Sequence, residues 1–82
     1  MDKLQNIRIV FVDIDGTLCN SRGIITLKTR MSIKKLVSRG VFVVIASGRN
    51  CKYTVDKSIR ALASSIVISS NGAEIYDYKK WV

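Results

Sequence analysis

An apolar run that ends in two carboxylates decides the fold: residues 7–18 read IRIVFVDIDGTL. Two more β-branched runs follow it, at residues 41–46 (VFVVIA) and 66–68 (IVI). None of the three alternates cleanly between apolar and polar residues, which is typical of strands buried on both faces, as in parallel sheets. The pattern therefore predicts an α/β fold whose first strand ends next to two acidic side chains.

Two helices are predicted between these strands. Helix-forming residues fill about 27–39, with Thr26 as N-cap and Gly40 where a left-handed residue commonly ends a helix. A second helix fits about 51–63, with Asn50 as its cap. The apolar positions expected to face the sheet are Ile33, Leu36 and Val37 in the first helix, and Cys51, Val55, Ile59, Leu62 and Ala63 in the second.

The element order, strand–helix–strand–helix–strand, makes two βαβ units. Because such crossovers are right-handed, a sheet that grows outward in a 3-2-1 order carries both helices on the same face. The opposite apolar face then has no cover, and we expect it to aggregate, bind a second copy, or pack against more polypeptide. The tail, residues 73–82, is predicted to form a short hairpin or the start of a strand.

Composition excludes several classes of protein. Eighty-two residues make one small domain at most, and the absence of histidine excludes a histidine-ligated metal or a histidine base. Two cysteines, Cys19 and Cys51, cannot form a disulfide scaffold, and unpaired thiols suit a reducing, cytoplasmic compartment. The longest apolar run, 41–46, is far shorter than the roughly 20 residues of a membrane span, so no membrane partner is expected.

The net charge of +8 permits binding to nucleic acid or to phosphorylated substrates. A solvated basic face explains the same charge. Aromatic residues are not interleaved with the basic ones, and no recognition-helix motif is present, so we expect no nucleic-acid partner.

The carboxylates Asp13 and Asp15 follow the first strand directly. Ligands bind at the carboxyl ends of strands in α/β sheets, and two neighbouring carboxylates favour a divalent cation. Gly16 permits a tight turn and Thr17 offers a hydroxyl, although Asp-Gly is also a common turn pair.

A second candidate anion site follows the second strand. Ser47 offers a hydroxyl, Gly48 a close backbone approach, and the exposed amides of the next helix a place for an anion. Arg49 adds charge there, or forms a structural salt bridge. Asn71 follows the third strand in an Asn-Gly pair, which also signals a hairpin turn.

The sequence Asp-x-Asp-Gly-Thr-Leu resembles the first motif of the haloacid dehalogenase superfamily, and the chain is most similar to its Cof-type phosphatase branch. The resemblance implies a three-layer, Rossmann-like core with a parallel sheet. It also implies that Asp13 is the nucleophile that forms an aspartyl-phosphate and that Asp15 is the general acid and base. The Asp13 carboxylate and the Asp15 carbonyl would ligate Mg²⁺.

The same resemblance implies which residues contact the phosphoryl group. In the first loop these are Ile14, Gly16 and Thr17. Ser47 matches the second motif, with Gly48 and Arg49 beside it, and Asn71 is a candidate lining residue of the substrate pocket. Residues 18–25 match the segment that follows the first motif in the family.

Two family features have no counterpart: the lysine of the third motif and the acidic cluster of the fourth. We therefore expect residues 1–82 to be the N-terminal portion of the core domain, with the cap and the C-terminal core missing. The expected function is Mg²⁺-dependent hydrolysis of a small phosphorylated metabolite, sugar phosphate-like, with the isolated chain inactive. Alternatives are a non-catalytic phosphate-binding or interaction module and a truncated fragment without its own function.

Overall fold

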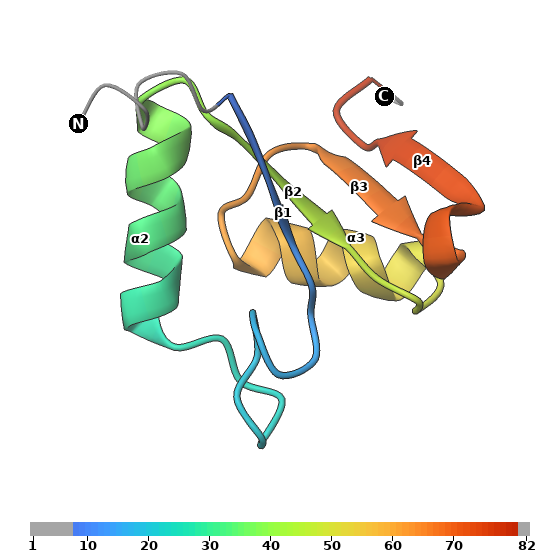
Figure 1. The fold of residues 1–82 in the computed structure, drawn as a ribbon, viewed down its shortest axis with the longest axis horizontal. Coiled ribbons are helices and arrows are strands. Elements are labelled where there is room, and N and C mark those ends of the chain that lie inside the picture. The colour runs from blue at the N-terminus through green and yellow to red at the C-terminus, as the bar shows by residue number, and fades with distance from the viewer. Residues whose placement is uncertain (1–7, 81–82) are drawn as a thin grey trace.

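The computed structural model describes residues 8–80 and contains a sheet flanked by two helices. Three strands and two helices alternate as predicted, and a fourth strand follows (Figure 1). The elements are β1 (Ile9–Val12), α2 (Leu27–Ser38), β2 (Phe42–Ala46), α3 (Cys51–Arg60), β3 (Ile66–Ser69), the 3-10 turn η1 (Ser70–Gly72) and β4 (Glu74–Asp77).

The strands lie in the order β1-β2-β3-β4. β2 pairs in parallel with both β1 and β3, which confirms the predicted outward growth of the sheet. β4 runs antiparallel to β3, with Ser69 opposite Glu74 and Ile66 opposite Asp77. The tail, predicted to form a short hairpin or the start of a strand, contributes one strand, β4, which forms a hairpin with β3, while residues 81–82 lie outside the described part.

Both predicted helix caps are confirmed. The Thr26 side chain accepts a hydrogen bond from the Thr29 amide at 3.2 Å, and the Asn50 side chain accepts one from the Tyr53 amide at 2.9 Å. Gly40 has a φ of +84°, the left-handed conformation expected after α2. Each cap satisfies an amide that the first helical turn leaves without a backbone partner.

α3 ends at Arg60, before the predicted residue 63. Leu62 adopts a φ of +62°, and the amide of Ala63 donates to the carbonyl of Ser58 at 3.1 Å. This is the hydrogen-bond pattern of a Schellman ending, in which glycine is the usual left-handed residue. A leucine at that position gave no sequence signal for the helix end.

The predicted apolar stripe of α3 is confirmed only in part, since Val55 and Ala63 pack against the core but Ile59 and Leu62 do not. Ile59 is 54% exposed and Leu62 is also exposed, whereas Thr54, Ser58 and Ala61 are fully buried. These small residues lie at i, i+4 and i+7 on one helix face. The two hydroxyl groups among them form hydrogen bonds within the chain: Thr54 donates to the carbonyl of Asn50, and Ser58 donates to the carbonyl of Ser64. α3 therefore faces the sheet with small and polar side chains as well as with Tyr53 and Val55.

The core lies between the helices and one face of the sheet. Val43, Ile45 and Val67 from the strands share a single buried cluster with Ile33 of α2 and Ala61, the C-cap of α3. Both helices thus cover the same face, as the right-handed crossovers require. Leu36 does not belong to this cluster, contrary to the expectation for α2, and is exposed at the helix surface.

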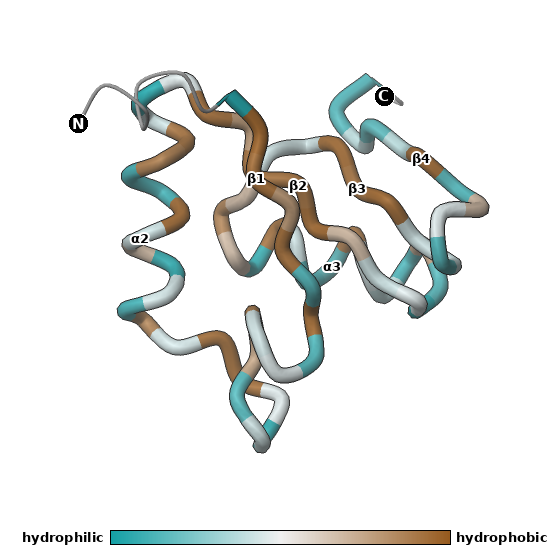
Figure 2. Tube along the Cα trace, viewed as in Figure 1, coloured by the Kyte–Doolittle hydropathy of each residue, from teal (hydrophilic) through white to brown (hydrophobic). Residues whose placement is uncertain are grey.

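The other face of the sheet has no cover among the described residues. No helix lies in front of β2 and β3 in Figure 1, and apolar residues continue along β1, β2 and β3 in Figure 2. Phe11 is 61% exposed and Ile75 is 73% exposed. This bare face, as we call it, consists of Ile9, Phe11, Phe42, Val44, Ile66, Ile68 and Ile75.

The described residues therefore form two layers, the sheet and its helices, of the three that the resemblance implies. The uncovered face predicted from the crossovers is confirmed. No helix in residues 8–80 is long and apolar enough to cross a membrane.

Candidate active site

The turn after β1 alternates between exposed carboxylates and buried apolar side chains. Ile14 is 0% exposed and Leu18 is buried beside it, whereas Asp13 and Asp15 are exposed. The turn closes through two backbone bonds, from the Leu18 amide to the Asp13 carbonyl at 3.0 Å and from the Cys19 amide to the Ile14 carbonyl at 2.9 Å. The apolar side chains thus anchor the loop while the acids face solvent.

The loop after β2 is held by the chain that leaves β3. The Ser47 amide donates to the Ile68 carbonyl at 2.8 Å, and the Ser47 carbonyl accepts from the Asn71 amide at 3.2 Å. The Ser70 amide donates to the Arg49 carbonyl at 2.8 Å. Ser47 itself is 7% exposed, and its hydroxyl accepts from the Arg49 amide at 3.0 Å. Ser47 is therefore fixed on both sides at the carboxyl edge of the sheet.

Gly48 permits the close approach of Asn71. A Cβ atom at residue 48 would lie 2.8 Å from Asn71 Oδ1, a distance that real side chains essentially never show. The group that approaches Gly48 in this structure is the Asn71 side-chain amide, and the predicted approach of the Gly48 backbone to a phosphoryl group stays a prediction.

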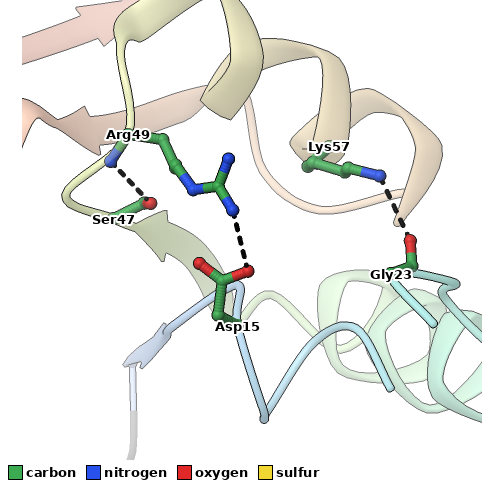
Figure 3. Close-up of polar contacts among 5 residues, drawn as sticks. All are labelled: Asp15, Gly23, Ser47, Arg49 and Lys57. Atoms are coloured by element: carbon green, nitrogen blue, oxygen red, sulfur yellow. Dashed lines mark hydrogen bonds and ion pairs between the residues drawn. The ribbon is translucent and has the colours of Figure 1, made fainter. Parts of the chain in front are cut away.

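An ion pair joins the two loops. Arg49 Nη2 lies 3.3 Å from Asp15 Oδ1, and both side chains are more than half exposed (Figure 3). The Arg49 guanidinium also lies over the Tyr53 ring, 4.6 Å from its centroid. The salt bridge that sequence reasoning considered for Arg49 is therefore present, and its partner is one of the two motif carboxylates.

The structure brings four predicted site residues to one depression of about 250 Å³ at the carboxyl ends of β1, β2 and β3. These are Asp13, Ser47, Gly48 and Asn71, and Ala46, Ile68 and Gly72 complete the lining. Parallel pairing explains the meeting, since the carboxyl ends of neighbouring parallel strands lie at one edge.

Four predicted phosphate-binding residues do not line this depression, and one of them, Arg49, is paired with Asp15 instead. The Ile14 side chain points into the core, so only its backbone is available to a ligand. Gly16, with a φ of +80°, and Thr17 form the exposed part of the turn. Their predicted contacts with a phosphoryl group stay predictions.

Residues 10–82 match the family model of haloacid dehalogenase-like hydrolases. The chain belongs to this family. It is 35% identical over 72 residues to the 5-amino-6-(5-phospho-D-ribitylamino)uracil phosphatase YcsE of Bacillus subtilis, covering 88% of this chain and 29% of that protein.

Solved structures of haloacid dehalogenase-like hydrolases share the fold. One from Bacteroides thetaiotaomicron superposes with a TM-score of 0.84 at 27% identity, covering 92% of this chain and 29% of that chain. BT1666 of the same organism, described among phosphatases of the haloalkanoate superfamily, has a TM-score of 0.80 at 29% identity, covering 92% and 28%. The chain thus spans less than a third of the length of these relatives.

Haloacid dehalogenase-like phosphatases generally use Mg²⁺, and the residues present fit such an ion in part. Asp13 and Asp15 supply the hard oxygen donors that Mg²⁺ prefers. However, no group of three acidic, cysteine or histidine residues with metal-binding spacing occurs in the part of the chain that the structure describes. Two carboxylates at the edge of an open depression leave most of an octahedral shell to water.

Sequence reasoning missed Ser70 and Tyr53, which both shape the site. Ser70 adopts a φ of +52° and Asn71 one of +55°, which turns the chain back over the Ser47 loop. Nothing in the sequence signals a left-handed serine. Tyr53 lies under Arg49, and here a signal existed, because residues four apart share one face of a helix and its N-terminal turn.

Proposed function

We propose that this chain carries the phosphoryl-transfer residues of a Mg²⁺-dependent phosphatase that works through an aspartyl-phosphate at Asp13. The observation that carries the proposal is the meeting of Asp13 with Ser47, Gly48 and Asn71 in one depression. A carboxylate nucleophile, a hydroxyl donor and an amide side chain are the groups that a transferred phosphoryl group requires. When bound, Mg²⁺ offsets the repulsion between the carboxylates and the phosphate oxygens.

The reaction divides into two displacements at phosphorus. In the first, a carboxylate oxygen of Asp13 bonds to phosphorus while the ester P–O bond breaks, and Asp15 gives its proton to the leaving alcohol oxygen. In the second, Asp15 takes a proton from water, whose oxygen attacks phosphorus while the bond to Asp13 breaks. Inorganic phosphate leaves, and both carboxyl groups return to their starting states.

Ser47 and Arg49 position this chemistry. The Ser47 hydroxyl is held by the Arg49 amide at the rim of the depression, where it can donate to a phosphoryl oxygen. The Arg49 side chain binds Asp15 at 3.3 Å and so restrains the orientation of the proposed acid and base. Because both groups are exposed, this ion pair contributes little to stability, and its effect is on orientation.

The proposed substrate is a small phosphorylated metabolite of the sugar-phosphate type. By its name, the relative YcsE acts on a phosphorylated ribityl compound. The open depression holds a phosphoryl group but has few side chains with which to select the rest of a substrate. A soluble phosphate ester, rather than a nucleic acid or a membrane lipid, is the proposed partner.

The proposal treats residues 1–82 as the N-terminal portion of the family's core domain, with little or no hydrolytic activity alone. Two observations support it. The match spans 29% of YcsE, and only two carboxylates of the described residues lie at the carboxyl edge of β1. With only these two carboxylates to hold Mg²⁺, the described residues would leave much of the charge that develops in the transition state uncompensated.

Binding of beryllium fluoride tests the nucleophile separately from turnover. With Mg²⁺ and fluoride present, we expect a protein-bound ¹⁹F NMR signal, because beryllium fluoride on a carboxylate mimics an acyl-phosphate. Asp13→Asn should abolish the signal, and Asp15→Asn should keep it, since Asp15 does not bond to phosphorus. If Asp15→Asn abolished the signal and Asp13→Asn kept it, Asp13 would not be the nucleophile.

Hydrolysis of an aryl phosphate separates the phosphatase from a non-catalytic phosphate-binding module. In the described residues, Asp13 and Asp15 do not belong to a larger acidic cluster that could hold a metal ion. For the isolated chain, this favours the non-catalytic phosphate-binding module. We expect no turnover above the rate of Asp13→Asn. Clear turnover that Asp13→Asn removes would show that the isolated chain is a complete catalyst.

A further inference from the structure

A second cavity, which shares no residue with the Asp13 depression, is lined by three cations. Its volume is about 310 Å³, and it lies between the loop after β1, α2 and α3. The lining residues are Gly23, Ile24, Ile25, Arg30, Lys57 and Arg60. Its size is at the lower end of the range of ligand pockets, which is roughly 300–1,000 Å³.

Two of these cations have no counter-charge among residues 8–80. Arg60 is paired with Asp56, with Nε and Oδ2 3.0 Å apart. For Arg30 and Lys57, no carboxylate of residues 8–80 lies within ion-pair distance. A cavity with two uncompensated positive charges attracts an anion of matching charge.

Arg30 shows the imbalance most clearly. Its side chain is half-buried, and its Nε is fully buried with no hydrogen-bond acceptor among the described residues. A buried donor without a partner costs free energy, and a charged one costs more. The planar guanidinium matches the oxygens of a phosphate, which it binds through paired hydrogen bonds.

Lys57 lines the cavity, and its ammonium makes two contacts within the chain. The ammonium donates to the Gly23 carbonyl at 3.4 Å (Figure 3). It also lies 5.4 Å from the centre of the Tyr53 ring. An ammonium has three donors, and the Gly23 carbonyl engages one of them. Lys57 therefore keeps hydrogen-bonding capacity for a ligand while its position is restrained.

We propose that this cavity is a second anion site, which binds a phosphate-bearing ligand through Arg30 and Lys57. A doubly charged phosphate balances both cations, whereas a single carboxylate leaves one of them uncompensated. The site is independent of the phosphoryl group at Asp13, since the two sets of lining residues do not overlap.

Titration of the ¹⁵N-labelled chain with inorganic phosphate tests the proposal. With Mg²⁺ removed by EDTA, repulsion from Asp13 and Asp15 disfavours phosphate at the first site. We expect saturable shifts of the Gly23 and Arg30 amides, without shifts at Gly48, and no such response to chloride at equal ionic strength. The response should persist in Asp13→Asn, so failure of the proposed phosphatase chemistry would leave this result intact.

Variants locate the site. Arg30→Gln and Lys57→Gln should each weaken phosphate binding about fivefold, by loss of one charge-assisted contact. Lys52→Gln removes the same charge from an exposed position on α3 outside the cavity and should change nothing. If Arg30→Gln unfolds the chain, the phosphate affinity of Lys57→Gln tests the proposal by itself. Non-saturable shifts at all lysines, or equal weakening by Lys52→Gln, would overturn the proposal.

Discussion

The two faces of the sheet are equally apolar in sequence but differ in what they contact. On one face Val43, Ile45 and Val67 are fully buried beneath α2 and α3. On the other, Phe11 and Phe42 are more than half exposed. Adjacent residues along a strand, such as Phe42 and Val43, thus differ in whether they stabilise the fold. Apolar character along a strand indicates that both faces are suited to burial, and the crossovers decide which face is covered.

The largest expected effect separates the two faces by stability. Ile45→Ala removes a fully buried side chain and should lower the free energy of unfolding by about 2–5 kcal/mol. Phe11→Ala, on the bare face, should cost less than about 1 kcal/mol, because the ring keeps most of its exposure in the folded chain. Urea denaturation of both variants measures the difference. Equal losses would mean that the bare face is covered in solution.

Self-association is the second test of the bare face, and the binding of a second copy there stays a prediction until it is measured. The double variant Phe11→Ser/Phe42→Ser should weaken self-association about tenfold, because less apolar surface is buried between copies. Met31→Ser is a matched control, since Met31 is exposed to a similar degree but lies on α2. Sedimentation at several concentrations measures the effect, and equal weakening by Met31→Ser would place the contact elsewhere.

A pair of glycine variants tests the two ends of β2, since Gly40 precedes this strand and Gly48 follows it. Gly48→Ala should displace the Asn71 side chain at a cost below about 1 kcal/mol, because only the end of a flexible side chain must move. Gly40→Ala meets no atom but sits at a φ of +84°, and should cost about 1 kcal/mol through backbone strain. Denaturation and the Asn71 side-chain amide signal measure the two effects. An unmoved Asn71 signal in Gly48→Ala would contradict the close approach.

The smallest effect concerns pH at β4, beside the bare face. A hydrogen bond from Ser65 lowers the pKa of Asp77 below its ordinary value, with further help from the Lys79 amide and from Lys80. A lowered pKa contributes stability that is present above the ordinary pKa of about 3.9 and is lost as the pH falls through the lower, folded value. Asp77→Asn should therefore remove a small part of the acid-induced loss of stability below pH 4. An unchanged acid profile in urea denaturation would contradict this role.

Local pattern predicted much of the fold. The three apolar runs became β1, β2 and β3, and Thr26 and Asn50 cap the helices, because strand burial and capping depend on residues close together in sequence. The inner face of α3 could not be read this way. Ser58 is buried because it donates to the Ser64 carbonyl and contacts the Tyr78 hydroxyl, and these partners lie 6 and 20 residues away.

The candidate site was likewise predictable where it depends on a local motif and unpredictable where it depends on long-range contacts. The Asp-x-Asp motif after an apolar strand was sufficient to predict two carboxylates at the carboxyl edge. Ser47 and Asn71 lie far from this motif in sequence. Only the parallel pairing of β1, β2 and β3 brings Asp13, Ser47 and Asn71 to one depression. Likewise, sequence reasoning offered two roles for Arg49, and the fold gives it Asp15 as a partner.

Amino-acid order thus accounts for the strands, the caps and the identity of the acidic and hydroxyl groups, since each depends on short-range periodicity or on side-chain chemistry. Folding in three dimensions adds what depends on long-range contacts: which sheet face is buried, how Asn71 closes over Gly48, and where Arg30 and Lys57 meet. These features follow from crossover handedness and strand register, which place residues dozens of positions apart within a few ångströms of one another.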